Sequence, residues 1–324
     1  MNEHFQQIIL KSTGASELKE LETIQSLWSG YGKIQRYELK GTALKTVVVK
    51  HVMLPEQHKH PRGWNTDISH ERKLKSYKVE TAWYKDWSKH CGDWCKVPKI
   101  YALKKLDDEV LMVMEDLDES GFGLRRSSVN WRDVELCLQW LANFHATFIH
   151  KAPEGLWEVG TYWHLATRPD ELKELNDKEL KSTAALMDKT LSSCKYLSFV
   201  HGDAKLANFC FSDKGDKVAA VDFQYVGGGC GMKDVAYFVG SCMYEEDCEQ
   251  NEQKVLDYYF AELQKALSQY KPDLNASEIE EEWRTMYHVA WADFHRFLKG
   301  WSPGHWKINS YSERVCREVI DKLR

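Results

Sequence analysis

The stretch that decides the fold reads FVHGDAKLANFCF and spans residues 199–211. Its apolar ends predict two short buried strands, at Leu197–Val200 and at Phe209–Phe211. The loop between these strands carries four polar side chains: His201, Asp203, Lys205 and Asn208. A further apolar strand begins at Val218 and ends on a second aspartate, Asp222. Acidic and amide groups therefore follow several neighbouring apolar strands.

These polar groups match the needs of phosphoryl transfer. A hairpin over the residues between Asn208 and Asp222 would place the two side chains side by side. A carboxylate and an amide oxygen suit Mg²⁺, which takes one or two carboxylates together with substrate phosphates. Asp203 is then left to receive a hydroxyl proton, and Lys205 offers a cation for the migrating phosphoryl group. The sequence thus predicts a metal, charge neutralisation and an oriented nucleophile at one place.

The remaining sequence divides into a strand-rich and a helix-rich part. Up to Leu117 it predicts a loop at His51–His70 and one helix at Glu71–His90. It also predicts four strands, at Gln35–Lys40, Ala43–Val52, Lys99–Leu103 and Val110–Met114. Beyond Leu117 the sequence predicts four helices, at Trp131–His150, Asp170–Lys195 (on the surface), Gln253–Leu267 and about Glu278–Gly300. Asn130 is the predicted N-cap of the first helix, and a Ser277-x-x-Glu280 capping box is predicted to start the last. We therefore expect a two-lobed α+β protein, divided into residues 1–116 and 117–324.

Composition narrows the class of function. The net charge of −5 makes the chain a poor candidate for nucleic-acid binding. No apolar run is long enough to span a membrane, and residues 1–7 lack the features of a secretory signal. The nine cysteines show no disulfide spacing, so we expect reduced thiols in the cytoplasm. Cys91 and Cys95 beside His90 lack a second ligand pair, which disfavours zinc.

The central motif resembles the catalytic loop of the kinase superfamily, His-x-Asp-x-x-x-x-Asn, which is followed by a metal-binding Asp-Phe-x. Its His-Gly-Asp form is similar to the aminoglycoside phosphotransferase and choline kinase branch. Asp222-Phe223-Gln224, with residues 234–238 behind it, most resembles the ecdysteroid kinase-like (choline-kinase-like) family. The resemblance implies a bilobal protein-kinase-like fold. Its N-terminal lobe would hold an antiparallel sheet with one helix, and its larger C-terminal lobe would be mostly helical.

Upstream segments resemble the same family, in the same order. Lys50 ends the strand that contains Val47–Val49, where the family places its phosphate-binding lysine. Glu80 matches the helix glutamate that pairs with this lysine. Glu71 on the same predicted helix is its rival, and the aromatic residues around Glu80 favour Glu80.

Two further segments correspond to the parts of the family that bind adenine and cover the phosphates, and the second matches only in part. Residues 112–117 are similar to the hinge strand whose backbone holds adenine, and residues 141–146 are similar to a helix of the larger lobe. Residues 29–32 (Ser-Gly-Tyr-Gly) are the candidate for the phosphate-covering loop, although they lack the full Gly-x-Gly-x-x-Gly. The resemblance implies nucleotide binding by Gly30, Gly32, Lys50, Glu80, Met114, Glu115, Asp116 and Leu117.

The resemblance also implies a role for each matched polar residue of the motif. Asp203 would be the catalytic base that orients the acceptor hydroxyl, and Lys205 would lie near the γ-phosphate. Mg²⁺ would be held by Asn208 and Asp222. Two further residues, His201 and Asp234, would hold the loop in place.

The acceptor site has the weakest signal in the sequence. The helix-rich part contains six tryptophans that would either cage a quaternary ammonium, line a flat pocket for a sterol-like alcohol, or belong to the core: Trp157, Trp163, Trp283, Trp291, Trp301 and Trp306. Trp291, Asp293 and His295 lie near one another on one predicted helix and are the acceptor candidates. Residues 245–247 (Glu-Glu-Asp) would attract a cation or form a solvated face. The glycine-rich residues 227–231 would serve as a connector or lie beside the metal or acceptor.

Together these patterns predict an ATP- and Mg²⁺-dependent kinase that phosphorylates a hydroxyl of a choline-, aminoglycoside- or sterol-like alcohol. The short span from Asp222 to Asp234 leaves no room for a protein-substrate platform, so we expect a small-molecule acceptor and no protein, nucleic-acid or membrane partner. Two alternatives remain, a nucleotide-binding pseudokinase scaffold and a nucleotidyl transferase that modifies proteins.

Overall fold

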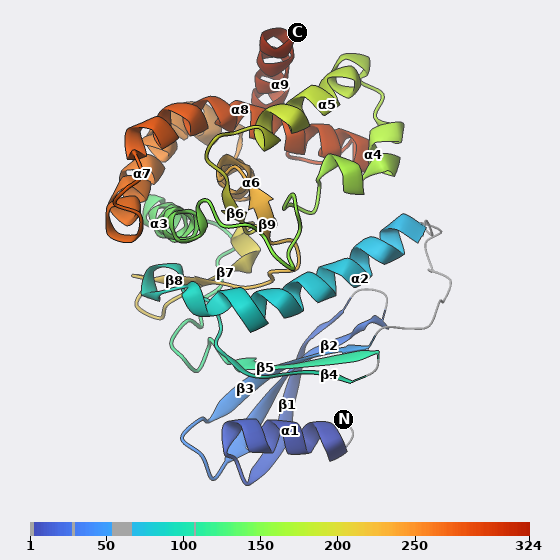
Figure 1. Cartoon of the computed structure of the whole chain (residues 1–324), viewed down its shortest axis with the longest axis vertical. Helices are drawn as coiled ribbons and strands as arrows, with labels where there is room; N and C mark the ends of the chain where they lie inside the picture. The colour runs from blue at the N-terminus through green and yellow to red at the C-terminus, as the bar shows by residue number, and fades with distance from the viewer. Residues whose placement is uncertain (1–2, 28–29, 54–66, 107) are drawn as a thin grey trace.

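An antiparallel five-stranded sheet forms the N-terminal part of the chain (Figure 1). The structure is a computed structural model that describes residues 3–27, 30–53, 67–106 and 108–324. The strands lie in the order β1-β2-β3-β5-β4. Their bounds are β1 Glu17–Ser26, β2 Gly32–Lys40, β3 Thr46–Met53, β4 Ile100–Leu106 and β5 Glu109–Glu115. The four predicted strands are confirmed as β2 to β5.

Helices cover both faces of this sheet. α1 (Glu3–Thr13) buries Phe5 and Ile9 against one face, where they meet Val47 and Val49 of β3. α2 (Asp67–Ala82) crosses the opposite face and lies between the sheet and the helical part of the molecule (Figure 1). Successive strand residues point to opposite faces, so Lys50, which follows Val49, faces α2. The alternation of β3 therefore aims the lysine at the interior of the molecule.

Long helices form the C-terminal part, as predicted, although the helices at Met232–Cys242 and Ser310–Leu323 have no counterpart in the sequence prediction. Their bounds are α3 Trp131–Phe148, α4 Pro169–Glu174, α5 Lys178–Ser192, α6 Met232–Cys242, α7 Glu245–Tyr270, α8 Ala276–Trp301 and α9 Ser310–Leu323. α8 packs against α4, α5, α6, α7 and α9, which explains why most of its length is buried. Within the described part of the chain, no helix is long and apolar enough to cross a membrane.

Two small antiparallel sheets lie between these layers and carry the central motif. β6 (Ser198–Val200) pairs with β9 (Gly227–Gly229), and β7 (Phe209–Phe211) pairs with β8 (Val218–Ala220). A Cβ atom on Gly227 would lie 2.2 Å from the carbonyl oxygen of Trp157. The glycine-rich segment is thus a buried strand that needs close backbone approach, and its interpretation as a flexible connector is wrong.

The predicted helix at Glu71–His90 differs from the structure at both ends. α2 starts earlier, at Asp67, and the segment then continues as a π-helical turn at Trp83–Trp87 and a 3₁₀ turn at Ser88–His90. The predicted loop over residues 51–70 overlaps β3 and α2, and its middle, residues 54–66, lies outside the described residues.

Capping explains two further differences. The single helix predicted over residues 170–195 is split, because Asp177 accepts a hydrogen bond from the backbone N–H of Leu180 and starts α5 anew. α8 begins at an Asn275 cap, which accepts from the N–H groups of Ser277 and Glu278, so the predicted Ser277 capping box is wrong. The predicted Asn130 cap of α3 is confirmed, with Asp133 completing a capping box.

α1 and β1 have no counterpart in the sequence prediction. β1 reads ELKELETIQS and exposes nearly every side chain, so it lacks the apolar alternation by which a half-buried strand is recognised. As an edge strand it pairs only with β2 and carries several charged side chains, which discourage pairing with other chains.

Candidate active site

The β7–β8 hairpin brings Asp222 next to Asn208. The backbone N–H of Val221 donates to the carbonyl oxygen of Asn208 at 3.0 Å, directly beyond the paired strands. Asp222 has a φ of +69°, an uncommon conformation for a residue with a side chain. Its Oδ1 atom is buried and has no hydrogen-bond partner among the described residues. Strain and an unpartnered buried oxygen together mark a site prepared for a ligand.

The loop between β6 and β7 is held in place by hydrogen bonds to Asp234, in the first turn of α6. Its carboxylate accepts from the backbone N–H groups of His201 and Gly202, at 2.5 and 3.0 Å. The imidazole of His201 is completely buried and contacts the carbonyl oxygen of Val221 at 3.0 Å. Gly202 has a φ of +79°, and a Cβ atom there would lie 2.1 Å from the carbonyl oxygen of Tyr225. His201 and Asp234 thus lie where they hold the loop in place.

Asp203 lies at the centre of the hydrogen-bond network. Its Oδ2 accepts from the Nζ of Lys205 at 2.9 Å and from the Nδ2 of Asn208 at 3.1 Å. Its Oδ1 accepts from the hydroxyl of Tyr237 at 3.0 Å. Burial raises the pKa of Asp203. Burial acts to lower the pKa of Lys205, but the carboxylates of Asp203 and Asp222 together raise that pKa above its usual value.

The donor set of this loop fits Mg²⁺. The Asn208 amide directs its NH₂ group to Asp203, so its carbonyl oxygen points elsewhere and can act as a ligand. Together with the unpartnered Oδ1 of Asp222, it offers the two hard oxygen donors that Mg²⁺ needs beside phosphates. In the described part of the chain, no group of three or more His, Cys, Asp and Glu side chains is placed to bind a metal, including the Cys91–Cys95 segment.

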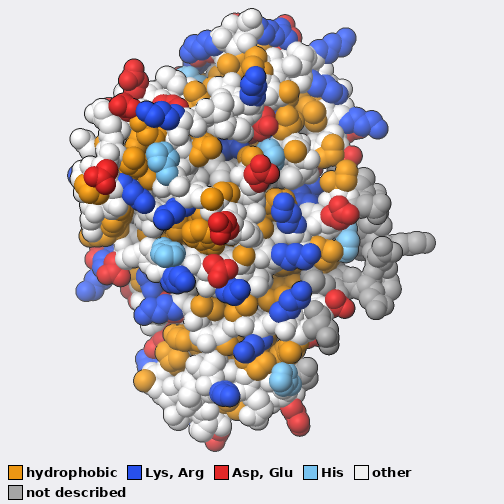
Figure 2. Space-filling view, in the orientation of Figure 1, with side chains coloured by type: hydrophobic (Ala, Val, Ile, Leu, Met, Phe, Trp, Pro, Cys, Tyr) orange, Lys and Arg blue, Asp and Glu red, His pale blue; other side chains and the backbone are white. Residues whose placement is uncertain are grey.

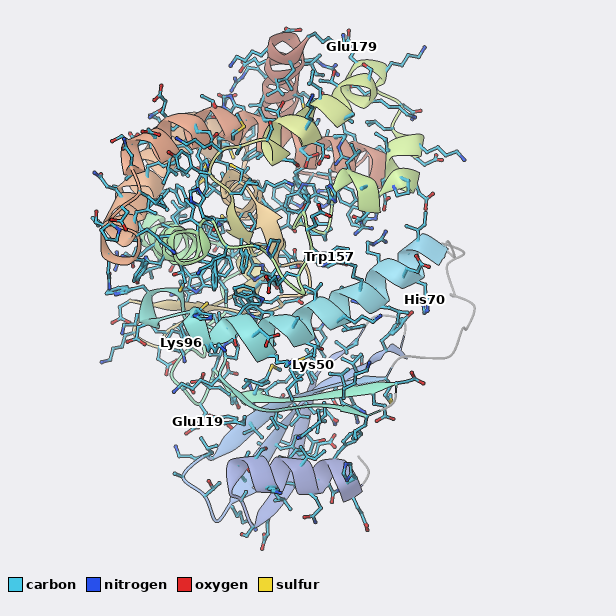
Figure 3. All side chains as sticks on the ribbon, in the orientation of Figure 1. Lys50, His70, Lys96, Glu119, Trp157 and Glu179 are labelled. Atoms are coloured by element: carbon cyan, nitrogen blue, oxygen red, sulfur yellow. The ribbon has the colours of Figure 1, made fainter. Side chains whose placement is uncertain are left out.

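Lys50 and Glu80 form a buried ion pair between β3 and α2. Figure 3 labels Lys50, which lies between the sheet and α2. The Nζ of Lys50 lies 2.7 Å from both carboxylate oxygens of Glu80. Burial raises the pKa of Glu80, while the lysine opposes this shift. The rival residue, Glu71, is exposed on the same helix. The structure therefore pairs Lys50 with Glu80.

A second lysine, missed in the sequence, lies at the same place. Lys73 donates from its Nζ to the Oε1 of Gln224 at 2.9 Å. Burial and the neighbouring Lys50 lower the pKa of Lys73 to about 8. Lys73, Tyr77 and Glu80 follow one another at helical spacing on one face of α2. This spacing was the sequence signal that could have identified Lys73, because a helix whose Glu80 side chain faces Lys50 also has its Lys73 side chain facing inward.

The hinge candidates Met114–Leu117 lie at and just beyond the end of β5, where their acidic side chains make structural contacts. The carboxylate of Glu115 accepts from the Nζ of Lys96 and the backbone N–H of Lys99, each at 3.0 Å. The carboxylate of Asp116 accepts from the Nε of Arg36 and the hydroxyl of Thr46, each at 2.7 Å. These side chains hold the segment in place, and its backbone is also partly engaged, since the carbonyl oxygens of Asp116 and Leu117 accept from the N–H groups of Ser120 and Phe122.

Gly30 and Gly32 form the tight turn between β1 and β2. Both have positive φ angles, +77° and +127°, and a Cβ on Gly32 would lie 2.0 Å from the carbonyl oxygen of His51. Between them, the hydroxyl of Tyr31 contacts the Nδ1 of His70 at 2.8 Å, which ties the turn to α2. Ser29 lies outside the described residues. Of the loop expected to cover the phosphates, the structure describes this turn, which Tyr31 ties to α2.

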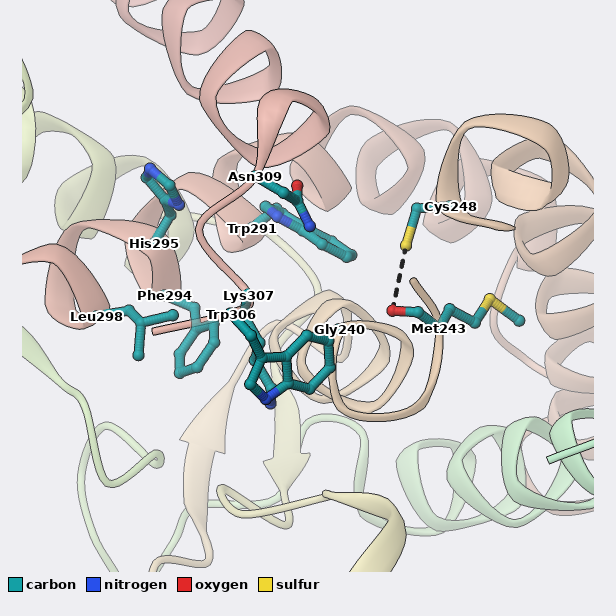
Figure 4. A pocket seen from close by; sticks show the side chains of 10 residues that line it. All are labelled: Gly240, Met243, Cys248, Trp291, Phe294, His295, Leu298, Trp306, Lys307 and Asn309. Carbon is teal, nitrogen blue, oxygen red and sulfur yellow. Dashed lines mark hydrogen bonds between the residues drawn. The ribbon is translucent and has the colours of Figure 1, made fainter. Parts of the chain in front are cut away.

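The three acceptor candidates on α8 are all buried. Asp293 accepts from Arg296 at 2.8 Å and from the indole N–H of Trp163 at 3.1 Å, so its carboxylate is committed to the core. Trp291 packs edge-on against Tyr311, with ring centroids 5.0 Å apart. Trp291 and His295 line a small pocket of about 10 Å³, shown in Figure 4, to which Asp293 does not contribute. The structure therefore does not bring the three together around one cavity.

Another side chain of this pocket contacts a residue that is hydrogen-bonded to Asp203. Lys307, in the loop between α8 and α9, places its Nζ 5.1 Å from the ring centroid of Tyr237, whose hydroxyl binds Asp203. It also lies 5.5 Å from the ring of Phe294 and 5.7 Å from that of Trp306. Burial lowers the pKa of Lys307 to about 8. No periodic pattern marked this residue, because it lies in a loop.

The glutamate and aspartate residues 245–247 form the first turn of α7. Acidic side chains there stabilise the positive end of the helix dipole, which explains their presence without a ligand. All nine cysteines of the chain are free thiols. The face of the molecule in Figure 2 shows acidic and basic side chains interspersed, with no extended patch of one charge.

Comparison with known proteins agrees with this geometry. The model of the ecdysteroid kinase-like family matches residues 39–155 and 157–272. A microcompartment-associated aminopropanol kinase has a similar structure, with a TM-score of 0.51, 14% sequence identity, and coverage of 100% of this chain and 99% of that chain. A Plasmodium vivax ethanolamine kinase is similar, with a TM-score of 0.50, 13% identity, and coverage of 97% and 86%. At such identities these structures show the fold alone. No curated protein matches the chain significantly.

Proposed function

Because the chain belongs to the ecdysteroid kinase-like family, we propose that it transfers the γ-phosphate of ATP to a hydroxyl group of a small molecule. The observation that carries this proposal is the Asp203 carboxylate, bonded to Lys205 and Asn208 beside the strand end that presents Asp222. Phosphoryl transfer requires little more than such positioning and charge stabilisation.

In this proposal, residues 1–116 and 117–324 act as two lobes that hold ATP between them. Lys50, positioned by Glu80, binds the phosphates from the sheet side. Lys73 adds a second positive charge from α2, and it leaves Gln224 for the phosphates when the nucleotide binds. The backbone of residues 114–117 holds the adenine base.

Asn208 and Asp222 would hold Mg²⁺ through the carbonyl oxygen of the amide and the unpartnered carboxylate oxygen. When bound, the ion neutralises phosphate charge. Asp203 is not needed as a ligand, since its two oxygens already accept from Lys205, Asn208 and Tyr237. It is therefore assigned to the acceptor hydroxyl.

Asp203 orients the acceptor hydroxyl and accepts its proton. Burial raises the pKa of this carboxylate, which makes it a stronger proton acceptor. The acceptor oxygen forms a bond to the γ-phosphorus while the bond to the β-phosphate bridging oxygen breaks, and ADP leaves. Lys205, 2.9 Å from Asp203, stabilises the negative charge on the transferred group.

The test is an assay of the whole chain with ATP, Mg²⁺ and a panel of alcohols, with products identified by mass spectrometry. We expect a phosphate group on an alcohol and the release of ADP. Transfer of AMP to protein would support the nucleotidyl-transferase alternative. Binding of Mg²⁺·ATP without transfer to any alcohol would support the scaffold alternative and contradict the proposal.

A further inference from the structure

The chain places an ammonium group of its own among the aromatic rings beside the reaction centre. The Nζ of Lys307 lies 5.1 to 5.7 Å from the ring centroids of Tyr237, Phe294 and Trp306. Rings at such distances attract a cation through their negative faces. They form the kind of surrounding that binds a quaternary ammonium ligand, and here a lysine of the protein already occupies it.

Lys307 lies close to the atoms that would react. The ring beneath its Nζ belongs to Tyr237, whose hydroxyl donates to the Oδ1 of Asp203 at 3.0 Å. The charges of Asp203 and Lys205 both act on the ammonium of Lys307, together with the thiol of Cys242 in α6. An acceptor whose hydroxyl reaches Asp203 therefore comes within electrostatic range of Lys307.

The charge of Lys307 has no carboxylate partner in an ion pair, as far as the described residues show. The Asp203 carboxylate is already bonded to Lys205. An ammonium group has three donors and no acceptor, so it favours an oxygen atom over another cation. The acidic first turn of α7, residues 245–247, is the rival feature, because it would attract a cation to the same side of the molecule.

The rim beside Lys307 is aromatic and exposed to solvent. Trp306 is 50% exposed and lies 5.5 Å from the ring of Tyr244, which is 71% exposed. On its other side, the ring of His305 stacks at 5.9 Å. Such a surface offers apolar contact to an acceptor without providing a negative charge.

Resting on the function proposed above, we propose that Lys307 is an acceptor-selecting residue. It donates a hydrogen bond to an oxygen atom of an uncharged or anionic alcohol, and it repels acceptors that carry an ammonium group. Its aromatic neighbours hold the lysine in place and provide apolar contact for the acceptor. The chain would then differ in acceptor class from the aminopropanol and ethanolamine kinases whose fold it shares.

The experiment compares alcohols that differ in charge and match in shape. The probes are choline with its uncharged isostere 3,3-dimethylbutan-1-ol, and 1-aminopropan-2-ol with propane-1,2-diol, each assayed with Mg²⁺·ATP. In the wild type, kcat/KM for the uncharged member should exceed that for the cation by about tenfold, the effect of one modest like-charge contact. Lys307→Glu should reverse this order, and Lys307→Met should remove it. Lys322→Glu, an equal charge change at an exposed site of α9, should leave the ratios unchanged.

Two results would overturn the inference and leave the proposed function intact. A wild type that uses the cation as well as its isostere would show that the acidic turn of α7 dominates, or that Lys307 does not face the acceptor. Ratios that Lys307→Glu and Lys322→Glu alter equally would show that net charge alone is responsible. Failure to phosphorylate any of the four alcohols or the wider panel, with Mg²⁺·ATP still bound, would instead contradict the proposed function, and this inference with it.

Discussion

The two sides of Asp203 hold their positive charges in different ways. On the side proposed to bind the nucleotide, Lys50 is paired with Glu80, and both Nζ–O distances are 2.7 Å. On the side proposed to bind the acceptor, Lys307 lies among aromatic rings and forms no ion pair with any described carboxylate. The position of a paired charge is fixed before a substrate binds, whereas an unpaired charge can discriminate between substrates of different charge. Changes on the first side should alter stability and ATP binding, and changes on the second should alter selectivity.

Removing the group between the two sides should have the largest effect. Asp203→Ala should lower kcat at least about 10²-fold, because the acceptor hydroxyl loses its base. Calorimetry should show that Mg²⁺·ATP still binds. Asp321→Ala, at an exposed position of α9, serves as the control and should keep full turnover. An Asp203 variant with normal turnover would contradict the assigned role.

The next largest effect should follow from a change at the proposed Mg²⁺ site. Asp222→Ala removes the buried carboxylate oxygen that has no partner in the protein, so the dependence of ATP binding on Mg²⁺ should disappear. Titrations of the variant by calorimetry with and without Mg²⁺ should give the same affinity. A variant whose binding is still enhanced by the metal as in the wild type would place the ion elsewhere.

Breaking the ion pair on the nucleotide side should cost stability. Glu80→Gln leaves the Lys50 ammonium buried without a carboxylate, and loss of one partner of a buried pair costs about 3–5 kcal/mol. Urea unfolding measures this change in the free energy of unfolding. Glu71→Gln, on the exposed face of the same helix, should change it by no more than about 0.5 kcal/mol. Equal effects of the two variants would argue against the pairing as a source of stability.

The second lysine of the nucleotide side should affect only ligands with phosphates. Lys73→Met should weaken ATP binding by about tenfold, the effect of one lost charge-assisted hydrogen bond, and leave adenosine binding unchanged. Lys78→Met, an exposed neighbour on α2, is the matched control. A variant that weakens adenosine and ATP alike would show that Lys73 acts through the fold instead.

The smallest effect should appear with pH on the acceptor side. Burial lowers the pKa of Lys307 to about 8, so this residue is charged at pH 7 and largely neutral at pH 9. The charge of choline does not titrate. Its kcat/KM relative to 3,3-dimethylbutan-1-ol should therefore rise between pH 7 and 9, by up to about tenfold. Lys307→Met should give a ratio independent of pH, and a wild-type ratio that stays constant would contradict the role of Lys307.

The sequence predicted best where chemistry and local structure coincide. The motif with Asp203 and Asn208 lies between two short apolar strands, so its spacing and its hairpin could both be recognised. Lys50 and Glu80 were found by resemblance and not by pattern, because an ion pair between a strand and a helix has no periodicity. Lys73 was overlooked although it lies on the same helical face as Glu80. Its spacing from Glu80 already indicated the inward direction, and its contact with Gln224 confirms that direction.

By itself, the sequence determined the α+β class, the order of the strand-rich and helix-rich parts and the hairpin that joins Asn208 to Asp222, because these depend on neighbours along the chain. Only the tertiary structure decided which polar groups are committed to the core and which are left for a ligand. Asp293 and Lys307 illustrate the difference, since each is a single charge on or near the same helix. Besides the local pair with Arg296, packing gave Asp293 the indole N–H of Trp163, and it placed Lys307 beside the rings of Tyr237 and Phe294. The contacts with Trp163, Tyr237 and Phe294 join different elements of the fold, and composition and spacing do not encode them.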